Sequence, residues 1–389
     1  MSTSPWKEWI PGALNDRQLQ EMITRGFIEN ANGCSIDYSS FDLRLSDVGY
    51  EMLRGSVKPQ GGGYEHFLTS ETNYARRLHF DGNGTVTLDP KKTYVFELKE
   101  RLSTKLKSSN IHGQATAKSS VGRVDVLARL IVDGMHNYEG FDKSMWDRGT
   151  GSMFLEVTPI TFKVRVKADR SLSQLRLFQG KPEGSEVQAE ELYEAVLLRD
   201  GPSSPDDYLR VDLSNLLIGT RSAAAFRAKA KIETPVNLWV EKDNNGKLVN
   251  RPDPNDYWEL EASEAGRVQI TQRNFYLLRS KERISLRRGI CVYCRAIDET
   301  IGEMRIHYAG FVHPYFGFPE KPGSPEGTPL IFEVRGHDVD VVLNDNEPLA
   351  RLQFYRMSQD CSETPDPKRL SPYNAQTLQL SRFFADFPA

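Results

Sequence analysis

Two stretches decide the fold of this chain: residues 153–166, MFLEVTPITFKVRV, and residues 330–336, LIFEVRG. Apolar and β-branched residues alternate with polar ones there, or run for a few positions, which is typical of short strands. Similar segments, ending near glycine or aspartate, occur at RLIVDGM (129–135), GICVYCRA (289–296) and DVDVVL (338–343). The pattern therefore predicts an all-β protein.

The two stretches also belong to an internal duplication. Corresponding residues lie 177 positions apart, because 333 minus 156 and 313 minus 136 give the same difference. The pairs are Lys118 with Arg295, His136 with His313, Tyr138 with Tyr315, Gly140 with Gly317, Glu156 with Glu333, and Leu175 with Leu352. A repeat at one constant spacing indicates two copies of one structural unit.

A helix signal precedes each copy. Asn15 with Gln18, and Ser185 with Gln188, have the spacing of a capping box, in which the two side chains close the first helical turn. A chain of 389 residues exceeds the usual size of a single core, about 250 to 300 residues. We predict a first domain over residues 1–182 and a second over residues 183–389, each beginning with a short helix.

Composition limits the possible partners. The chain has 50 Lys and Arg against 53 Asp and Glu, a net charge of −3, which gives no reason to expect binding to a nucleic acid polymer or to a membrane surface. It has no apolar run of about 20 residues, and its first residues lack the order of a signal peptide. We expect a cytoplasmic protein.

The segment AKSSVGRVDV, residues 117–126, interrupts the strand pattern with hydroxyl groups and positive charge. Ser119 and Ser120 offer hydroxyls and backbone N–H groups, and Arg123 offers a delocalised charge, which together can hold phosphate oxygens. A polar surface turn is the simpler interpretation of these three residues taken alone.

The order of motifs makes the phosphate interpretation more specific. SIDYSSFDLRLSD (35–47), AKSSVGRVDV (117–126), AGFVHPYFG (309–317), a strand glutamate and YNAQTLQLSR (373–382) follow one another along the chain. This series resembles the dCTP deaminases of the trimeric dUTPase superfamily, in the long, duplicated bacterial form. The resemblance implies two tandem dUTPase-like domains, each a distorted jelly roll or β-barrel.

The resemblance also implies a function. It predicts hydrolytic deamination of dCTP to dUTP and ammonia, in which a glutamate accepts a proton from the attacking water and returns it. No catalytic zinc is expected, and Mg²⁺ is expected only as a companion of the triphosphate. The partners would be dCTP and dUTP, together with further copies of the chain in a homo-oligomer with threefold or pseudo-threefold symmetry.

Site residues follow position by position from the matching motifs. The predicted catalytic residues are Glu156, Glu333, Ser119 and Arg123. The predicted nucleotide-binding residues are Lys118, Ser120, Ala309, His313, Tyr315, Tyr373, Gln376 and Arg382. No residue is predicted to bind a metal. A catalytic carboxyl needs a dry pocket that raises its pKa, and the apolar neighbours of both glutamates suit that need.

The two repeats diverge in a complementary way. The second has Arg295, Ala296, Ile297 and Thr300 where the first has Lys118, Ser119, Ser120 and Arg123, whereas the second has the better base-binding turn and the C-terminal tail. We therefore expect composite sites, with phosphate groups from the first repeat and the turn and lid from the second. Which glutamate reacts stays open. Both turns carry histidine, His136 or His313, where the family usually has aspartate, so recognition of the sugar is in question.

Other interpretations compete with this one. The first is dUTP diphosphohydrolase activity, alone or combined with deamination; the second is a non-catalytic nucleotide sensor or structural protein. A strand glutamate can face solvent, His313 can be an ordinary turn residue, and the tail can be a frayed end.

The Cys-x-x-Cys at Cys291 and Cys294 suggests a zinc-dependent deaminase, but such enzymes also use a His-x-Glu motif, which this chain lacks. In a strand, residues three apart point to opposite faces, so we expect core thiols.

Overall fold

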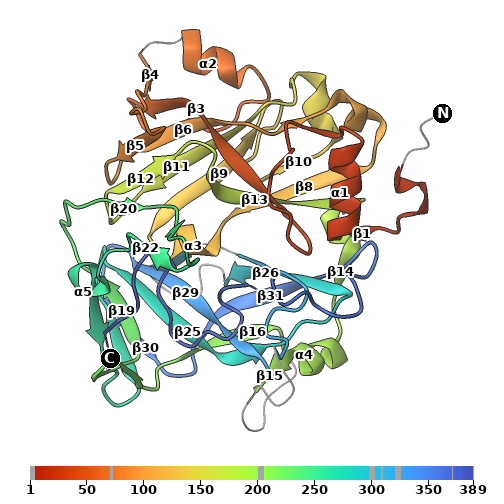
Figure 1. The fold of residues 1–389 in the computed structure, drawn as a ribbon. Helices are drawn as coiled ribbons and strands as arrows, with labels where there is room; N and C mark the ends of the chain where they lie inside the picture. Colours follow the sequence, from red (N-terminus) through yellow and green to blue (C-terminus); the bar gives the residue numbers. More distant parts are fainter. Residues whose placement is uncertain are drawn as a thin grey trace.

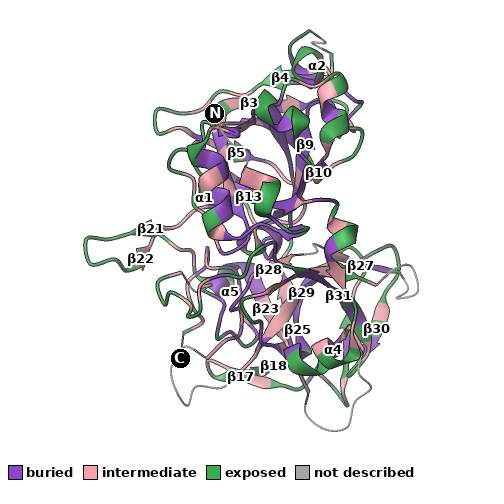
Figure 2. Ribbon diagram, turned by 90° about the vertical axis from the view of Figure 1, so that its right-hand side faces the viewer, coloured by how far each residue is buried: buried purple, intermediate pink, exposed green. Residues whose placement is uncertain are grey.

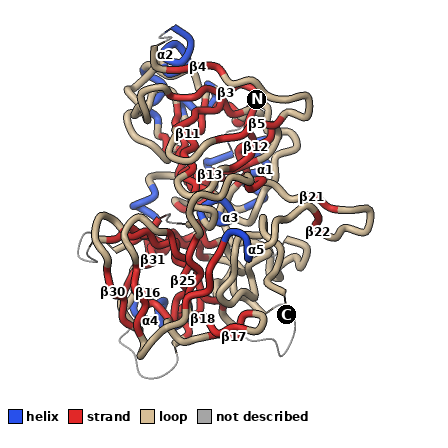
Figure 3. Tube along the Cα trace, turned by 90° about the vertical axis from the view of Figure 1, so that its left-hand side faces the viewer, coloured by secondary structure: helices blue, strands red, loops and turns tan. Residues whose placement is uncertain are grey.

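The computed structural model describes residues 5–70, 73–199, 206–297, 303–307, 310–319, 326–369 and 371–388. Ala309 and Thr300 lie outside these described residues. The first half of the chain, red to yellow-green in Figure 1, forms one β-rich body, and the second half, green to blue, forms another beside it. Figure 3 shows from another side that strands, in red, far outweigh helices, in blue, in both bodies. The prediction of an all-β protein with two tandem dUTPase-like domains is confirmed.

The first body is built on a nine-stranded sheet within the described residues. Its main path runs β10 (Gly140–Phe141), β8 (Ile111–Ala117), β13 (Ser171–Gln179), β3 (Phe41–Met52), β6 (Thr93–Leu98), β11 (Met153–Pro159) and β9 (Val126–Val132), with β1 (Gly12–Ala13) on β13 and β4 (Ala75–Arg77) on β3. Smaller sheets are β20 (Val236–Asn237) with β12 (Val164–Lys167) and β5 (Thr85–Leu88), and β2 (Ile28–Glu29) with β7 (Arg101–Leu102).

The second body repeats that order. The described strands pair in the order β28 (Phe311–Val312), β26 (Ile290–Ala296), β31 (Pro348–Arg356), β16 (Tyr208–Asp212), β25 (Phe275–Ile284), β29 (Thr328–Gly336) and β27 (Met304–His307). Further strands are β19 (Ala225–Ala228) with β23 (Trp258–Glu261), β14 (Glu186–Val187), β15 (Leu197–Leu198), β17 (Leu216–Ile218) with β18 (Arg221–Ala223), β21 (Glu241–Lys242) with β22 (Leu248–Val249), and β24 (Arg267–Ile270) with β30 (Val341–Asn344).

The duplication extends to individual contacts. Strand β31 begins and ends 177 positions after β13. In the first repeat the backbone N–H and the guanidinium of Arg44 both donate to the buried Glu100 carboxylate. In the second, the backbone N–H and the guanidinium of Arg210 donate to Glu282 in the same way. In the first repeat the pair connects β3 to a glutamate just after β6, and in the second it connects β16 to a glutamate within β25.

Helices are short. They are α1 (Asp16–Thr24), α2 (Tyr64–Ser70), α3 (Ser119–Gly122), α4 (Glu190–Val196) and α5 (Pro254–Tyr257), with 3₁₀ turns η1 (Pro5–Glu8), η2 (Thr104–Ser108), η3 (Lys143–Asp147) and η4 (Pro182–Ser185). No helix among the described residues is long and apolar enough to cross a membrane.

The expected capping box is present at the first helix and absent at the second. Asn15 and Gln18 exchange the two capping hydrogen bonds at the start of α1. The prediction of a second capping box, at Ser185, was wrong. Ser185 ends the turn η4 and donates to the Pro182 carbonyl, and α4 begins five residues later, after Ala189. Pro182 favours a turn at that point because its fixed φ suits the first position of a helical turn.

Segments far apart in sequence join the two bodies. Strand β20 of the second half adds to β12 of the first in parallel, from Val164 to Val236. The end of the chain returns to the first core, where Leu378, Leu380 and Phe384 are buried. Figure 2 shows buried segments, in purple, continuing across the junction of the two bodies. The C-terminal tail is therefore packed into the molecule and is not a frayed end.

Candidate active site

The Ser-Ser-x-x-Arg segment forms a single helical turn, α3, between β8 and β9. The N–H groups of Val121 and Gly122 donate to the Lys118 carbonyl and that of Arg123 donates to the Ser119 carbonyl, which closes the turn. The interruption of the strand pattern in the sequence thus corresponds to a helical turn. Ser119 is exposed, whereas the Ser120 and Arg123 side chains are buried.

Glu333 of β29 lies directly against this turn, although it comes from the other repeat. A Cβ atom on Gly122 would be 2.7 Å from the Glu333 carboxyl carbon and closer still to Oε2. Real Cβ atoms almost never approach so closely. Only the missing side chain of Gly122 allows the carboxyl group to reach the backbone of α3, and this contact brings Arg123 and Glu333 together.

The environment of Glu333 changes its acidity. The side chain is buried, and within the described part of the chain no group forms a hydrogen bond with Oε2. Burial raises the pKa of Glu333 well above its usual value; the charge of Arg123 lowers it, and that of Asp125 raises it further. A carboxyl group in such surroundings can hold a proton near neutral pH and release it again.

Glu156, the counterpart of Glu333, is in a different situation. Its Oε1 accepts hydrogen bonds from the Arg129 guanidinium at 2.5 and 3.1 Å, and its Oε2 accepts from the hydroxyls of Ser56 and Tyr138 at 2.5 and 3.1 Å. Arg129 lies directly opposite Glu156 on strand β9. Both oxygens of Glu156 are thus bonded within the first repeat.

The C-terminal tail covers the Ser-Ser-x-x-Arg turn. The Tyr373 hydroxyl lies 2.8 Å from Ser120 Oγ, and the Arg123 guanidinium stacks 3.9 Å from the centre of the Tyr373 ring. Arg123 donates to Gln376 Oε1 at 2.7 Å and to the Gln379 carbonyl at 3.0 Å. The structure therefore brings Ser120, Arg123, Tyr373 and Gln376 into one cluster.

The same tail also contacts the turn of the second repeat, which carries His313 and Gly317. Asn374 accepts from the Gly317 N–H at 2.7 Å and thereby connects the tail to that turn. The His313 imidazole is 2.8 Å from Ser39 of the first repeat, and burial lowers the pKa of His313 to about 4. The Tyr315 hydroxyl is already bonded to the Ser362 carbonyl. His313 thus lies at the contact between the two repeats.

Two models of one protein family together match most of the chain. The model of the 2′-deoxycytidine 5′-triphosphate deaminase N-terminal domain matches residues 10–181, and that of the C-terminal domain of the same family matches residues 189–384. The chain belongs to the dCTP deaminase family. The predicted family, and with it a deaminase enzyme that converts dCTP, is confirmed.

A solved structure extends this result. A 2′-deoxycytidine 5′-triphosphate deaminase from Agrobacterium tumefaciens aligns with a TM-score of 0.76 and 23% identity, over 90% of this chain and 96% of that one. At that identity the likeness establishes the shared fold. The comparison with curated proteins gives no significant match.

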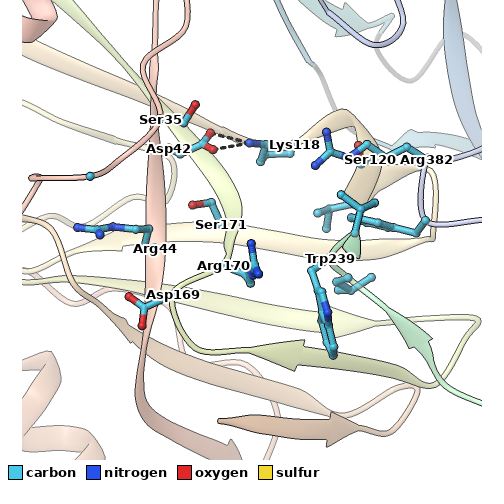
Figure 4. A pocket seen from close by; sticks show the side chains of 15 residues that line it. Ser35, Asp42, Arg44, Lys118, Ser120, Asp169, Arg170, Ser171, Trp239 and Arg382 are labelled. Atoms are coloured by element: carbon cyan, nitrogen blue, oxygen red, sulfur yellow. Dashed lines mark hydrogen bonds and ion pairs between the residues drawn. The ribbon is translucent and has the colours of Figure 1, made fainter. Parts of the chain in front are cut away.

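A polar cleft opens beside the Ser-Ser-x-x-Arg turn of this dCTP deaminase family member (Figure 4). It holds about 190 Å³. Its charged and hydroxyl-bearing lining comprises Ser35, Asp42, Arg44, Lys118, Ser120, Asp169, Arg170, Ser171 and Arg382, and Trp239 closes one side. Lys118 is bonded to both oxygens of Asp42, at 2.6 and 2.7 Å. The predicted residues Lys118, Ser120 and Arg382 therefore meet around one cavity, in which cations outnumber carboxylates.

Several residues around the site were missed by sequence reasoning. Asp125, fully buried and two residues after Arg123, forms an ion pair with Arg335 of the second repeat and accepts from Thr161 at 2.5 Å. Arg176 is also fully buried, and its guanidinium donates to the Val292 carbonyl of the second repeat. Arg129 and Arg176 lie in ordinary strand patterns, so no local signal marked them. The position of Asp125 inside the segment AKSSVGRVDV, two residues after Arg123, was the one usable signal.

The two cysteines of the Cys-x-x-Cys segment face different clusters. Cys291 packs with Tyr38, Phe178 and their neighbours, whereas Cys294 packs against the core of the second repeat. Burial and the nearby Glu333 raise the pKa of Cys294 to about 12, so its thiol stays protonated. Among the described residues, no three His, Cys, Asp or Glu side chains gather closely enough to hold a metal ion.

Proposed function

We propose that this chain deaminates dCTP at the junction of its two repeats, with Glu333 as the general base and acid. The observation that supports this assignment is the buried Glu333 carboxyl held against Gly122 and Arg123. In the reaction, Glu333 removes a proton from a water molecule as the water oxygen bonds to C4 of cytosine. This proton passes to N3 as the C4–N3 double bond opens. The proton of the new C4 hydroxyl then passes through Glu333 to the 4-amino group, the bond between C4 and that amino group breaks, a C4 carbonyl forms, and dUTP and ammonia leave.

The Ser-Ser-x-x-Arg turn is proposed to receive the charged part of the substrate. Arg123 supplies positive charge beside the developing negative charge of the intermediate, and the exposed Ser119 hydroxyl can orient the attacking water. Lys118, Ser120 and Arg382 line the polar cleft, where cationic and hydroxyl groups suit a triphosphate.

Magnesium is proposed to enter with the triphosphate as its counterion. Of the two carboxylates in the cleft, Asp42 is bonded to Lys118 and Asp169 to Lys99. The cleft therefore offers more to phosphate oxygens than to a bare cation.

Glu156 is proposed to have a structural role. Arg129, Ser56 and Tyr138 use both of its oxygens, so it lacks a free oxygen to accept a proton from water. The first repeat would then contribute the phosphate side and the second the proton-transfer side. Both sides lie in one chain, with repeat boundaries proposed at residues 182 and 183.

Two further proposals concern the location and the assembly of the enzyme. The enzyme is proposed to act in the cytoplasm. It assembles into a homo-oligomer with threefold or pseudo-threefold symmetry. A mass measurement by light scattering in solution tests this assembly: a monomer at working concentration contradicts it.

The activity itself is tested by measuring products. Purified enzyme is incubated with dCTP, dUTP or CTP in magnesium buffer, and ammonia and pyrophosphate are quantified. We expect ammonia from dCTP without pyrophosphate. Pyrophosphate release from dUTP would identify diphosphohydrolase activity, and no turnover of any nucleotide would contradict the proposal.

A further inference from the structure

The buried carboxylate of Asp125 connects the Ser-Ser-x-x-Arg turn to the strand that carries Glu333. Asp125 follows α3, and its backbone N–H donates to the Gly122 carbonyl at 2.8 Å. Its side chain forms an ion pair with Arg335, which lies two residues after Glu333 on β29. Side chains two residues apart in a strand point to the same face. The ion pair therefore joins β29 to the turn on the face where Glu333 meets Gly122.

Further hydrogen bonds hold both members of this ion pair in place. Asp125 Oδ2 accepts from the Arg335 guanidinium and, at 2.5 Å, from the Thr161 hydroxyl. Arg335 also donates to Thr161 Oγ1 at 2.6 Å and to the Arg273 carbonyl. Asp125 is fully buried, and the Arg335 side chain is 15% exposed. Solvent therefore screens these two charges only weakly, and each acts strongly on its neighbours.

The charged and titratable groups around Glu333 come from its own strand and from the elements packed against it. Among the described residues they are Arg123 and Asp125 from the turn, Cys294 from β26, Arg335 from β29 and, by the register of β27, His307. Strand β25 places the apolar Leu277 opposite Glu333. The Cys294 thiol stays protonated and adds no charge. The groups of fixed charge in this set are therefore two arginines and one carboxylate.

The two members of the ion pair act on Glu333 in opposite directions. The negative charge of Asp125 disfavours a second carboxylate nearby and raises the pKa of Glu333. The positive charge of Arg335, like that of Arg123, favours the ionised form. With both arginines and without Asp125, Glu333 would be held as a carboxylate and would be a weaker base. Asp125 thus offsets one of the two positive charges.

We infer that Asp125 and Arg335 are positioning residues for the proton transfer: their ion pair holds Glu333 against the turn and balances the charge around it. This inference rests on the proposed function, because it takes Glu333 as the general base. Neither side chain lines the polar cleft. Substitution of either residue should therefore change kcat and leave KM for dCTP close to its native value.

Two substitutions in the same ion pair distinguish this role from a purely structural one. Asp125→Asn removes the negative charge, and asparagine tolerates the φ of 58° at this position. Arg335→Met removes the positive charge. Both substitutions break the same contact, so a purely structural role predicts the same effect from both. Charge balance around Glu333 predicts opposite effects.

The first measurement is the pH dependence of kcat for ammonia release from dCTP. A general base acts in its ionised form, so kcat rises with pH through the pKa of Glu333. The pH at half of the maximal kcat should be lower than native in Asp125→Asn and higher in Arg335→Met. Well below the native midpoint, kcat relative to its own maximum should change about threefold or more, upward in the first variant and downward in the second.

Two controls accompany these variants. Glu233→Gln removes another ion pair between the two halves of the chain, the one with Lys163, and should leave the midpoint unchanged. Both substitutions are also repeated in the His307→Gln enzyme, where the two opposite shifts should persist. Loss of the shifts in that enzyme would assign the titration to His307 and overturn the inference.

Infrared spectroscopy measures the protonation of Glu333 without turnover. Each protein is compared with the same protein carrying Glu333→Gln, so that the difference isolates the band of the protonated Glu333 carboxyl. With rising pH this band should disappear earlier than native in Asp125→Asn and later in Arg335→Met. If Asp125→Asn does not fold, Arg335→Lys replaces it in the comparison: it keeps the charge and should titrate closer to native than Arg335→Met. Equal midpoints in the two Arg335 variants would overturn the inference.

The inference and the proposed function fail in different ways. Midpoints that move in the same direction in Asp125→Asn and Arg335→Met, or that do not move, overturn the role of the ion pair, even if the native enzyme releases ammonia from dCTP. Opposite infrared shifts in a protein that releases no ammonia support the charge balance around Glu333 and contradict the deaminase proposal.

Discussion

Gly122 and Glu333 are in contact across the two repeats: the carboxyl group occupies the space where any side chain at residue 122 would begin. The contact places a proton-accepting group against the turn that carries Arg123. It also means that one position in the first repeat controls the geometry of a residue more than 200 positions later.

The two corresponding glutamates should respond differently to the same substitution. Glu333→Gln removes the proposed base and should reduce kcat by about 10²- to 10⁴-fold. Glu156→Gln should keep kcat within a few-fold of native and lower the free energy of unfolding by about 1–3 kcal/mol, because Arg129 then loses a charged partner. Steady-state ammonia release and urea unfolding measure the two effects. Equal, full activity in both variants would remove Glu333 from the mechanism.

Gly122→Ala should reduce activity without unfolding the protein. Alanine favours the helical turn, but its Cβ would collide with Glu333 and force the carboxyl group aside. A displacement of about 1 Å at a reacting group can cost about a hundredfold in rate. Gly184→Ala is the control, since a Cβ atom there meets no atom within 4 Å. If both variants have native kcat, the close contact has no catalytic consequence.

We expect the C-terminal tail to contribute to substrate binding through the hydroxyl of Tyr373. This hydroxyl lies 2.8 Å from Ser120 Oγ and accepts from the Arg382 N–H at 3.1 Å. Tyr373→Phe loses both contacts and should raise KM for dCTP several-fold, because Ser120 and Arg382 line the polar cleft. Thr377→Ala, at an exposed position of the same tail, should leave KM unchanged. An unaltered KM in Tyr373→Phe would separate the tail from substrate binding.

The buried ion pair between Asp125 and Arg335 should couple the stability of the two repeats. Asp125→Asn leaves Arg335 without its charged partner and should destabilise the protein by about 3–5 kcal/mol. The double variant Asp125→Asn with Arg335→Met should lose less than the sum of the two single variants. A double-mutant cycle by urea unfolding measures this difference. Additive losses would show that the two side chains act independently.

Stability should depend on pH through Glu333. Its pKa in the folded protein lies above its unfolded value near 4.5, so the native state holds a proton that the unfolded state releases. The free energy of unfolding therefore falls as pH rises from about 4.5 toward the folded pKa. Glu333→Gln cannot titrate and should become more stable relative to native as pH rises from 4.5 to 8. A difference in stability that does not vary over this range would contradict the raised pKa.

Local sequence patterns were sufficient to predict the class of fold and the internal repeat. Alternation in segments such as residues 153–159 predicted strands because one face of each is buried, and the spacing of 177 predicted that β13 and β31 are equivalent. The capping box at Asn15 was found for the same reason, since its partners are three residues apart. The error at Ser185 arose because Pro182, three residues earlier, begins a separate 3₁₀ turn that ends at Ser185.

The sequence by itself determined the class of fold, the duplication and the motif Ser119, Ser120 and Arg123, because each depends on residues close together in the chain. It could not distinguish Glu156 from Glu333, since both follow apolar strand residues. Only the tertiary structure decided that Arg129 lies opposite Glu156, whereas Gly122 meets Glu333. The acidity of a carboxyl group depends on the charges and solvent around it, and here those neighbours come from distant strands and from the other repeat.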